Sequence, residues 1–202
     1  MKLDMASLNR NGNNLKGKTM DQKLILRGEK VHLIPFDIKR DAEKFVNWRR
    51  NSEYLRLMDG SHAVQFSKEK IKHWLEEDAE SNTFVFFMIK TNSEERIIGE
   101  IGLSDFDGKF VNAFVGISIG DPSDWGHGYG SEAMRLILNY GFYVMNLHHI
   151  SLTVFEYNPR AIRSYEKVGF KHEGIQRQFL NRDGRRWDMY RMGILQTEWE
   201  IK

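Results

Sequence analysis

Three alternating glycines stand directly before a predicted helix in the stretch Trp125 Gly126 His127 Gly128 Tyr129 Gly130 Ser131 Glu132 Ala133. Glycine has no Cβ atom, so the backbone can turn tightly and approach a ligand closely. The first amides of the following helix have no acceptor within the helix, and the helix dipole is positive at that end. A loop of this kind suits an anion such as a pyrophosphate.

The segments on either side of this loop have clear periodicities. Ala133, Leu136 and Ile137 are spaced i, i+3 and i+4, so they share one face of a helix. Residues 114–119 form a short apolar run typical of a strand, and the polar, proline-containing residues 121–124 end it. The predicted order is therefore strand, turn, glycine-rich loop and helix.

Two common phosphate-binding motifs do not fit this loop. A Walker A loop requires Lys and then Ser or Thr after its last glycine, whereas Gly130 is followed by Ser131 and Glu132. The dinucleotide fingerprint requires a third glycine at position 131, which is a serine. A plain turn remains an alternative for the loop alone, because turns use the same glycines.

A second signal follows at residues 150–170. Apolar and polar residues alternate over residues 150–154, as expected of a strand. A capped helix comes next, in which Asn158 suits the N-cap, Pro159 the first helical position and Gly169 the C-terminal cap. Tyr165 lies nearly two helical turns after Asn158, so both side chains are expected to face one cleft.

Together the two segments resemble the Gcn5-related N-acetyltransferases, and within them the branch of ribosomal-protein N-terminal and spermidine N-acetyltransferases. The resemblance covers most of residues 22–200 and includes the pattern Asn-x-x-Ala…Tyr-Glu-x-x-Gly-Phe at residues 158–170. In this family the coenzyme A pyrophosphate is bound by a short motif, Arg/Gln-x-x-Gly-x-Gly/Ala, in which x is any residue. Gly128 and Gly130 match the two small positions, and Trp125 stands where Arg or Gln is usual.

The resemblance implies an α+β fold with a mixed, largely antiparallel sheet flanked by helices, and acetyl-CoA as co-substrate without a metal. The cofactor-binding residues it implies are Ile117, Ser118, Ile119, Trp125, Gly126, His127, Gly128, Tyr129, Gly130, Ser131, Asn158 and Tyr165. In the family, the strand that carries residues 117–119 separates from the strand at 150–155, and the thioester enters the gap. A backbone amide of that strand would stabilise the oxyanion.

The chemistry of acetyl transfer explains the catalytic residues that we expect. A lysine-like amine has a reference pKa of about 10.4, so making it neutral at pH 7 costs about 4 to 5 kcal/mol. The departing thiolate, with a thiol pKa near 8.5, can take a proton from a phenol of pKa ~10 held nearby. By resemblance Tyr165 lies beside the thioester sulfur and is our candidate acid. Asn158 is expected to hydrogen-bond the pantetheine arm or an ordered water.

Glu100 is the candidate general base. It alternates with the apolar residues of a predicted strand, so its side chain need not lie in the core. The alternative is an ordinary solvated carboxylate on the surface of the strand. Polyamine acetyltransferases also tend to carry an acidic residue on the next strand, but residues 112–114 contain none, which weakens a polyamine acceptor.

The rest of the chain gives coarser expectations. Strands are expected at residues 24–26, 31–34 and 84–89, helices at 42–50 and 67–78, and a hairpin turn at Asp183 and Gly184. No histidine pair with carboxylates has metal-ligand spacing. The chain has no cysteine and no apolar run long enough for a membrane span, so we expect a cytoplasmic protein that contacts no membrane.

Charge separates residues 1–19 from the remainder. The net charge of the 202 residues is +2, and the tail holds four basic residues against Asp4 alone. This composition predicts a disordered basic extension followed by one acetyltransferase domain over residues 20–202. Because the domain itself has no basic excess, nucleic acid is not an expected partner.

Two functions remain open. The first is an N-acetyltransferase that moves acetyl from acetyl-CoA directly to a primary amine. Protein or peptide N-termini rank slightly ahead of polyamines, amino sugars and antibiotics as acceptors, by analogy alone. The alternative is a catalytically idle acyl-CoA-binding sensor or interaction protein on the same fold, and a homo-oligomer is possible for either.

Overall fold

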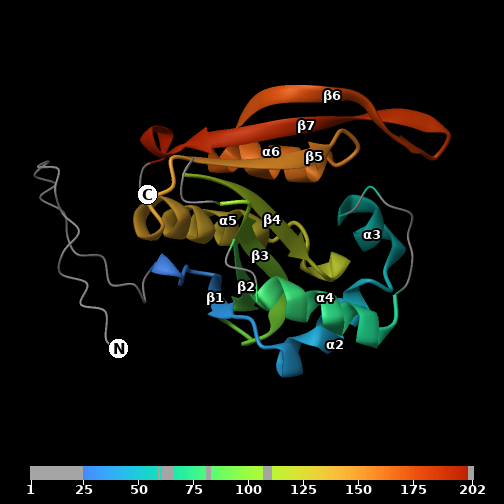
Figure 1. Ribbon diagram of the computed structural model, residues 1–202, viewed down its shortest axis with the longest axis vertical. Helices are drawn as coiled ribbons and strands as arrows, with labels where there is room; N and C mark the ends of the chain where they lie inside the picture. The colour runs from blue at the N-terminus through green and yellow to red at the C-terminus, as the bar shows by residue number, and fades with distance from the viewer. Residues whose placement is uncertain (1–24, 59, 61–65, 81–82, 107–110, 200–202) are drawn as a thin grey trace, which may run out of the picture.

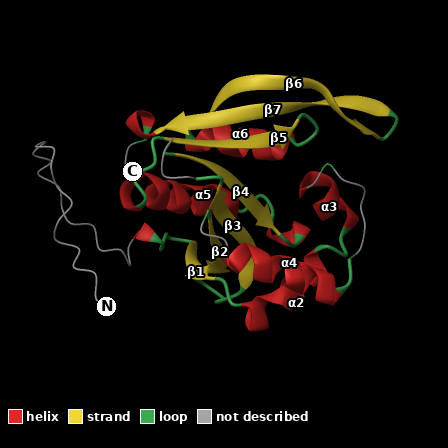
Figure 2. Ribbon diagram, viewed as in Figure 1, coloured by secondary structure: helices red, strands yellow, loops and turns green. Residues whose placement is uncertain are grey.

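The computed structural model describes residues 25–58, 60, 66–80, 83–106 and 111–199, and the predicted tail at 1–19 lies outside these ranges. A seven-stranded sheet runs through the molecule in the order β1-β2-β3-β4-β5-β7-β6, with helices on both faces (Figures 1 and 2). The strands are β1 (Val31–Pro35), β2 (Phe84–Thr91), β3 (Ile97–Ser104), β4 (Asn112–Ile119), β5 (His149–Phe155), β6 (Lys171–Arg182) and β7 (Arg185–Leu195). The helices are α2 (Ile38–Trp48), α3 (Ser52–Met58), α4 (Lys68–Glu80), α5 (Tyr129–Asn139) and α6 (Pro159–Val168).

Alternation along β2 divides the core into two layers. Phe87 and Ile89 point to one face and join the larger cluster, which α5 and α6 complete. Met88 points to the other face and packs against Phe45 of α2 and Ile71 of α4. The predicted strand at 84–89 is therefore covered on both faces, as an unbroken apolar run requires. Figure 1 shows α2 and α4 together at one end of the sheet and β5, β6 and β7 at the other.

One pair of neighbouring strands departs from the antiparallel pattern. β4 and β5 are parallel and pair only from Asn112 with His149 to Phe114 with Ser151. Beyond this point β4 stays paired with β3, and β5 stays paired with β7. The separation expected between these two strands is confirmed. It leaves the edge of β4 that faces β5 without a partner strand over residues 115–119.

The mixed, largely antiparallel fold class is confirmed, because five of the strand pairings are antiparallel and one is parallel. The hairpin turn is also confirmed: Asp183 and Gly184 have φ of 55° and 70° and join β6 to β7. Both values match the positive φ that a tight two-residue turn needs.

The predicted strand at 24–26 is wrong in the part that the structure describes. Ile25 lies in a helical turn, and the chain then reverses, with the amide of Gly28 donating to the carbonyl of Val31 at 2.8 Å. Three apolar residues are too few to distinguish a strand from a turn by periodicity. Helix α3 was missed, although Asn51 marks its start by accepting hydrogen bonds from the amides of Glu53 and Tyr54.

None of the helices in the described part of the chain combines the length and the apolar character needed to cross a membrane.

Candidate active site

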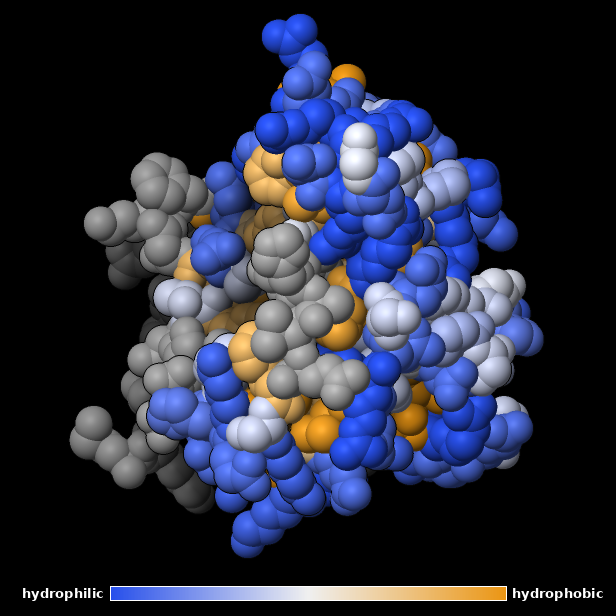
Figure 3. Space-filling model, turned by 90° about the vertical axis from the view of Figure 1, so that its right-hand side faces the viewer, coloured by the Kyte–Doolittle hydropathy of each residue, from blue (hydrophilic) through white to orange (hydrophobic). Residues whose placement is uncertain are grey.

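A cavity of about 680 Å³ opens where β4 and β5 separate. The glycine-rich loop and the first turns of α5 and α6 line one part of it, and α3 with β2 and β3 lines the other. Figure 3, which faces the side of α3, shows apolar side chains gathered in the middle of an otherwise hydrophilic face. The sheet thus splits to form a pocket with a polar, loop-lined part and a more apolar part.

The glycine-rich loop has the geometry of an anion cradle. Gly126 and Gly128 have φ of 81° and 85°, a left-handed conformation that strains other residues. Gly128 is the N-cap of α5 and offers no side chain to the helix. The first intrahelical bond runs from the amide of Glu132 to the carbonyl of Gly128, so the amides before it are available to a ligand.

Contacts on several sides hold the loop in place. The indole Nε1 of Trp125 donates to the carbonyl of Ile119 at 2.8 Å. Asp124, just before it, forms a two-bond ion pair with Arg96 at 2.8 and 3.2 Å, and this contact raises the pKa of the Arg96 guanidinium. Lys30 Nζ donates to the carbonyl of His127 at 2.9 Å. The loop is therefore braced in its left-handed conformation rather than free to rearrange.

Glu132 in the first turn of α5 fixes the start of β1. Its carboxylate accepts hydrogen bonds from the backbone amides of Glu29, Lys30 and Val31 at 2.7 to 3.0 Å. Sequence reasoning missed this residue and Lys30, because the contact joins residues about one hundred positions apart. A negative charge in the first turn also interacts favourably with the helix dipole.

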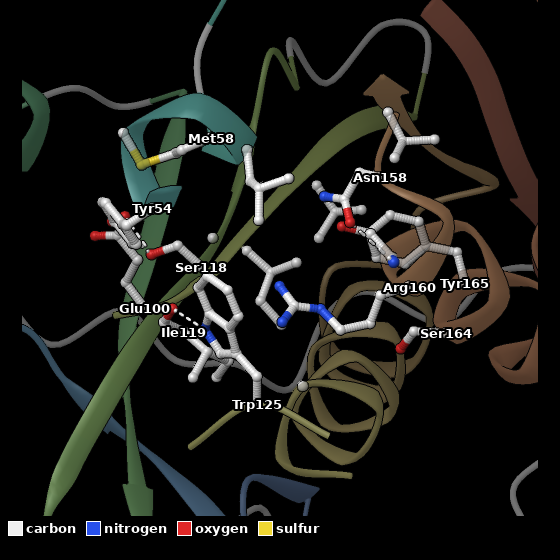
Figure 4. A pocket seen from close by; sticks show the side chains of 18 of the residues that line it. Tyr54, Met58, Glu100, Ser118, Ile119, Trp125, Asn158, Arg160, Ser164 and Tyr165 are labelled. Atoms are coloured by element: carbon white, nitrogen blue, oxygen red, sulfur yellow. Dashed lines mark hydrogen bonds between the residues drawn. The ribbon is translucent and has the colours of Figure 1, made fainter. Parts of the chain in front are cut away.

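The ring of Trp125 makes a cation–π contact with an arginine of another helix. The guanidinium of Arg160, in the first turn of α6, lies 3.7 Å from the centre of the Trp125 ring (Figure 4). Burial lowers the pKa of Arg160 below its ordinary value, which still leaves the side chain charged near neutral pH. Trp125 stands where related loops carry Arg or Gln, and in this chain the positive charge comes from Arg160 instead. This residue too was missed, since only the fold brings α6 to the loop.

Asn158 and Tyr165 face the same cavity, as predicted from their spacing (Figure 4). Asn158 is the N-cap of α6, and its Oδ1 accepts from the amide of Ala161 at 3.2 Å. Gly169 ends the helix with φ of 123°. Burial raises the pKa of Tyr165 to about 12, so its phenol keeps its proton at neutral pH.

Glu100 lies at the other side of the cavity in a short chain of hydroxyl groups. The Ser118 hydroxyl donates to Glu100 Oε1 at 3.0 Å, and the Tyr54 hydroxyl lies 3.0 Å from Ser118 Oγ (Figure 4). Because Ser118 has one hydrogen, Tyr54 is the donor in the second bond. Burial and the charge of Glu100 raise the pKa of Tyr54. Glu100 is half-buried and lines the cavity, which excludes a fully solvated strand carboxylate.

The centre of the cavity, between the loop and this hydroxyl chain, has room for an extended ligand. A Cβ atom placed on Gly116 of β4 would meet no other atom within 4 Å. Gly116 belongs to the part of β4 that has no partner strand on the β5 side. The face of β4 at Gly116 therefore borders open space within the cavity, beside the unpaired part of the strand, and an extended ligand fits there.

The structure brings nearly all of the predicted site residues together. The cavity is lined by Glu100, Ile117, Ser118, Ile119, Trp125, Gly126, Gly128, Tyr129, Gly130, Ser131, Asn158 and Tyr165. His127 is the exception: its exposed ring stacks on Tyr129 at 5.7 Å, and its carbonyl is occupied by Lys30. Within the described ranges, no cluster of three or more His, Cys, Asp or Glu side chains could hold a metal ion.

Comparison with known proteins agrees with this geometry. Residues 30–171 match a family model described as an acetyltransferase (GNAT) domain. The probable N-acetyltransferase YjcK of Bacillus subtilis is 28% identical over 166 residues, which are 79% of this chain and 91% of that protein. Spermidine N(1)-acetyltransferase of Vibrio cholerae is 29% identical over 154 residues, 68% of this chain and 87% of that protein.

A solved structure extends the likeness to three dimensions. The spermidine N-acetyltransferase of Vibrio cholerae in complex with CoA and spermine has a TM-score of 0.75 and 25% identity, covering 83% of this chain and 96% of that one. Fold, site and relatives together define an acyltransferase. The chain belongs to the GNAT family of N-acetyltransferases.

Proposed function

We propose that this protein transfers an acetyl group from acetyl-CoA directly to a primary amine. The observation that carries the proposal is the meeting of three features at one cavity: the braced glycine loop, the unpaired edge of β4 and the protonated phenol of Tyr165. Each feature supplies one requirement of acetyl transfer, namely cofactor binding, oxyanion stabilisation and protonation of the leaving group.

The described residues fit coenzyme A. Amides of residues 128–131, at the positive end of α5, hold the pyrophosphate, and Arg160 adds a positive charge beside them. The space at Gly116 admits the pantetheine arm next to β4. Asn158 Oδ1 is used by its helix cap, so its amide nitrogen is the group that remains for the arm or for a water.

Glu100 takes the proton from the acceptor amine, directly or through Ser118. An ammonium group cannot attack a carbonyl, so a base near the attacking nitrogen is needed at neutral pH. Glu100 lies inside the cavity and is linked to Ser118 and Tyr54, which keep its side chain in one orientation. The neutral nitrogen then forms the new amide bond with the acetyl carbon.

Tyr165 gives its proton to the sulfur of coenzyme A as the carbon–sulfur bond breaks. Its raised pKa keeps the phenol protonated before that moment. A backbone amide within residues 117–119 of β4 stabilises the oxyanion, since this part of the strand has no partner on the β5 side. The nitrogen loses its second proton as the amide forms, and this proton restores the neutral phenol of Tyr165. The products are the N-acetylated amine, the free thiol and the one proton that Glu100 then releases to solvent.

Protein or peptide N-termini rank ahead of polyamines as acceptors in this proposal. The Vibrio cholerae relative is a spermidine acetyltransferase, so polyamines stay among the candidate acceptors. An idle acyl-CoA sensor is the weaker alternative, because the candidate base Glu100, the candidate acid Tyr165 and the glycine loop line one cavity.

Release of free thiol from acetyl-CoA tests the proposed function. Peptides, polyamines and amino sugars serve as candidate acceptors, and coenzyme A affinity is measured by calorimetry in parallel. We expect turnover with one acceptor class and saturable binding of coenzyme A. Tight coenzyme A binding without turnover of any acceptor would favour the sensor instead.

Tyr165→Phe is expected to lower kcat by roughly a hundredfold or more, the usual contribution of a general acid. The affinity for coenzyme A should stay at the wild-type value, because the ring remains. With a pKa of about 12, wild-type Tyr165 is still about 99% protonated at pH 10. The alkaline limb of the wild-type profile should therefore not begin below pH 10 on account of this group. Tyr140→Phe, outside the cavity, is the matched control, and equal rates for the two variants would contradict the assignment.

Glu100→Gln is expected to lower kcat/KM at pH 7 by roughly a hundredfold. The deficit should shrink as the pH rises towards the pKa of the acceptor amine, because the free base then forms without help. The measurement is a pH profile of thiol release from pH 6 to pH 10. Glu43→Gln, an exposed carboxylate of α2, is the control. A Glu100→Gln profile parallel to the wild type would show that Glu100 is not the base.

Arg160→Ala is expected to weaken coenzyme A binding by roughly ten- to a hundredfold, the usual range for hydrogen bonds to charged groups. Dephospho-coenzyme A should show the same loss, because it retains the pyrophosphate. Acetyl-pantetheine, which has no phosphate, should bind both proteins equally. Calorimetry measures all three, and Arg163→Ala, an exposed arginine of α6 outside the cavity, is the control. A loss that is as large with acetyl-pantetheine would exclude a phosphate contact.

A further inference from the structure

The end of the cavity beyond the hydroxyl chain contains an arginine whose hydrogen-bonding capacity is not used. Arg49 is the C-cap of α2 and lines the cavity. Its Nη1 atom is buried and has no hydrogen-bond partner in the part of the chain that the structure describes. The guanidinium instead lies 5.5 Å from the ring centre of Phe45. A buried charged donor without an acceptor is costly, so this nitrogen favours a ligand that brings an oxygen.

Arg49 and Glu100 carry opposite charges and shift the pKa of the Tyr54 hydroxyl in opposite directions. All three side chains line the cavity, and the charge of Glu100 raises the pKa of Tyr54 while that of Arg49 lowers it. The Tyr54–Ser118–Glu100 chain then gives the position of the negative group. A ligand seated here meets one anion and one cation within the reach of a small molecule.

The remaining walls of this end are mostly apolar, with Ser104, the strand partner of Phe84, as a polar exception. Their apolar part is formed by Leu57, Met58, Leu75, Phe84 and Phe86. Among these, Leu75 is buried in the layer that α2 and α4 form on the sheet. Such a wall suits an uncharged hydrocarbon group and not a second ammonium group.

We infer that the acceptor is an α-amino acyl unit with an apolar side chain, whose amine faces Glu100 and whose carbonyl or carboxylate oxygen is bound by Arg49. This inference rests on the proposed acetyl transfer and names its acceptor class. The planar guanidinium provides the donors that such an oxygen requires. A free amino acid and the N-terminal residue of a peptide share this chemistry.

The same charges disfavour a polyamine. Of the described residues that line the cavity, only Glu100 and Asp124 are acidic, and Asp124 is already paired with Arg96. A polyamine would bring at least two further positive charges towards Arg49 and the apolar wall. Like charges at such a site cost binding free energy instead of providing it.

Four acceptors separate the possibilities: leucinamide, a leucyl peptide, free leucine and isopentylamine, which keeps the amine and the side chain of leucine but lacks the carbonyl group. In the wild type we expect kcat/KM per neutral amine, corrected for the α-amino pKa of about 8 and the alkylamine pKa of about 10.4, to be roughly ten- to a hundredfold higher for at least one leucyl compound than for isopentylamine. Comparison of the peptide with free leucine shows whether the acceptor is the N-terminal residue of a peptide or a free amino acid. Spermidine, measured alongside, should rank below the leucyl compounds.

Arg49→Gln should reduce the ratio between the preferred leucyl compound and isopentylamine, taken per neutral amine, to near one. Arg50→Gln, the exposed neighbouring arginine, should leave that ratio at its wild-type value. An equal loss for all acceptors in Arg49→Gln would overturn the inference. If this variant does not fold, the wild-type ranking decides alone, and isopentylamine or spermidine at the rate of the preferred leucyl compound, per neutral amine, would overturn the inference.

Failure of the proposed function gives a different result. Without any acetyl transfer, none of these acceptors would release thiol in the wild type, and this inference would fall with the proposal on which it rests. Transfer to isopentylamine and spermidine alone would leave the acetyltransferase proposal intact and remove only the role of Arg49.

Discussion

The separation of β4 from β5 is the constraint on which the other features of this protein depend. The two strands share three residue pairs and then part, while β3 and β7 hold their other edges. A split sheet is tolerable only because each strand keeps one complete ladder of hydrogen bonds. The backbone groups left on the facing edge of β4 have no partner strand and lie at the cavity, where a linear ligand can provide one.

The two ends of the cavity in this gap carry different charges. At the loop, helix amides and Arg160 present positive charge, which suits phosphates. Tyr165 lines the same cavity as a neutral phenol, because burial disfavours its ionised form. At the far end, Glu100 and Arg49 provide one negative and one positive group near Tyr54. The cavity therefore combines a region that suits phosphates with one that carries a charge of each sign.

Preorganisation accounts for the unusual number of contacts at the glycine loop. Two of its glycines have positive φ, and an unbraced loop would lose conformational entropy when it bound a ligand. Lys30, the pair of Arg96 with Asp124, and the indole of Trp125 all hold the loop beforehand. Binding energy from the nucleotide can then be used to position the thioester at β4.

The sequence by itself determined the features that depend on neighbouring residues. The glycine cradle, the caps of α6 at Asn158 and Gly169, and the turn at Asp183 were all predictable, because backbone conformation and short-range hydrogen bonds decide them. Most of the candidate site followed from the same two segments. Only the tertiary structure decided the contacts between distant residues. The stacking of Arg160 on Trp125 and the approach of Arg49 to Tyr54 depend on how helices pack against the sheet, which local periodicity does not encode.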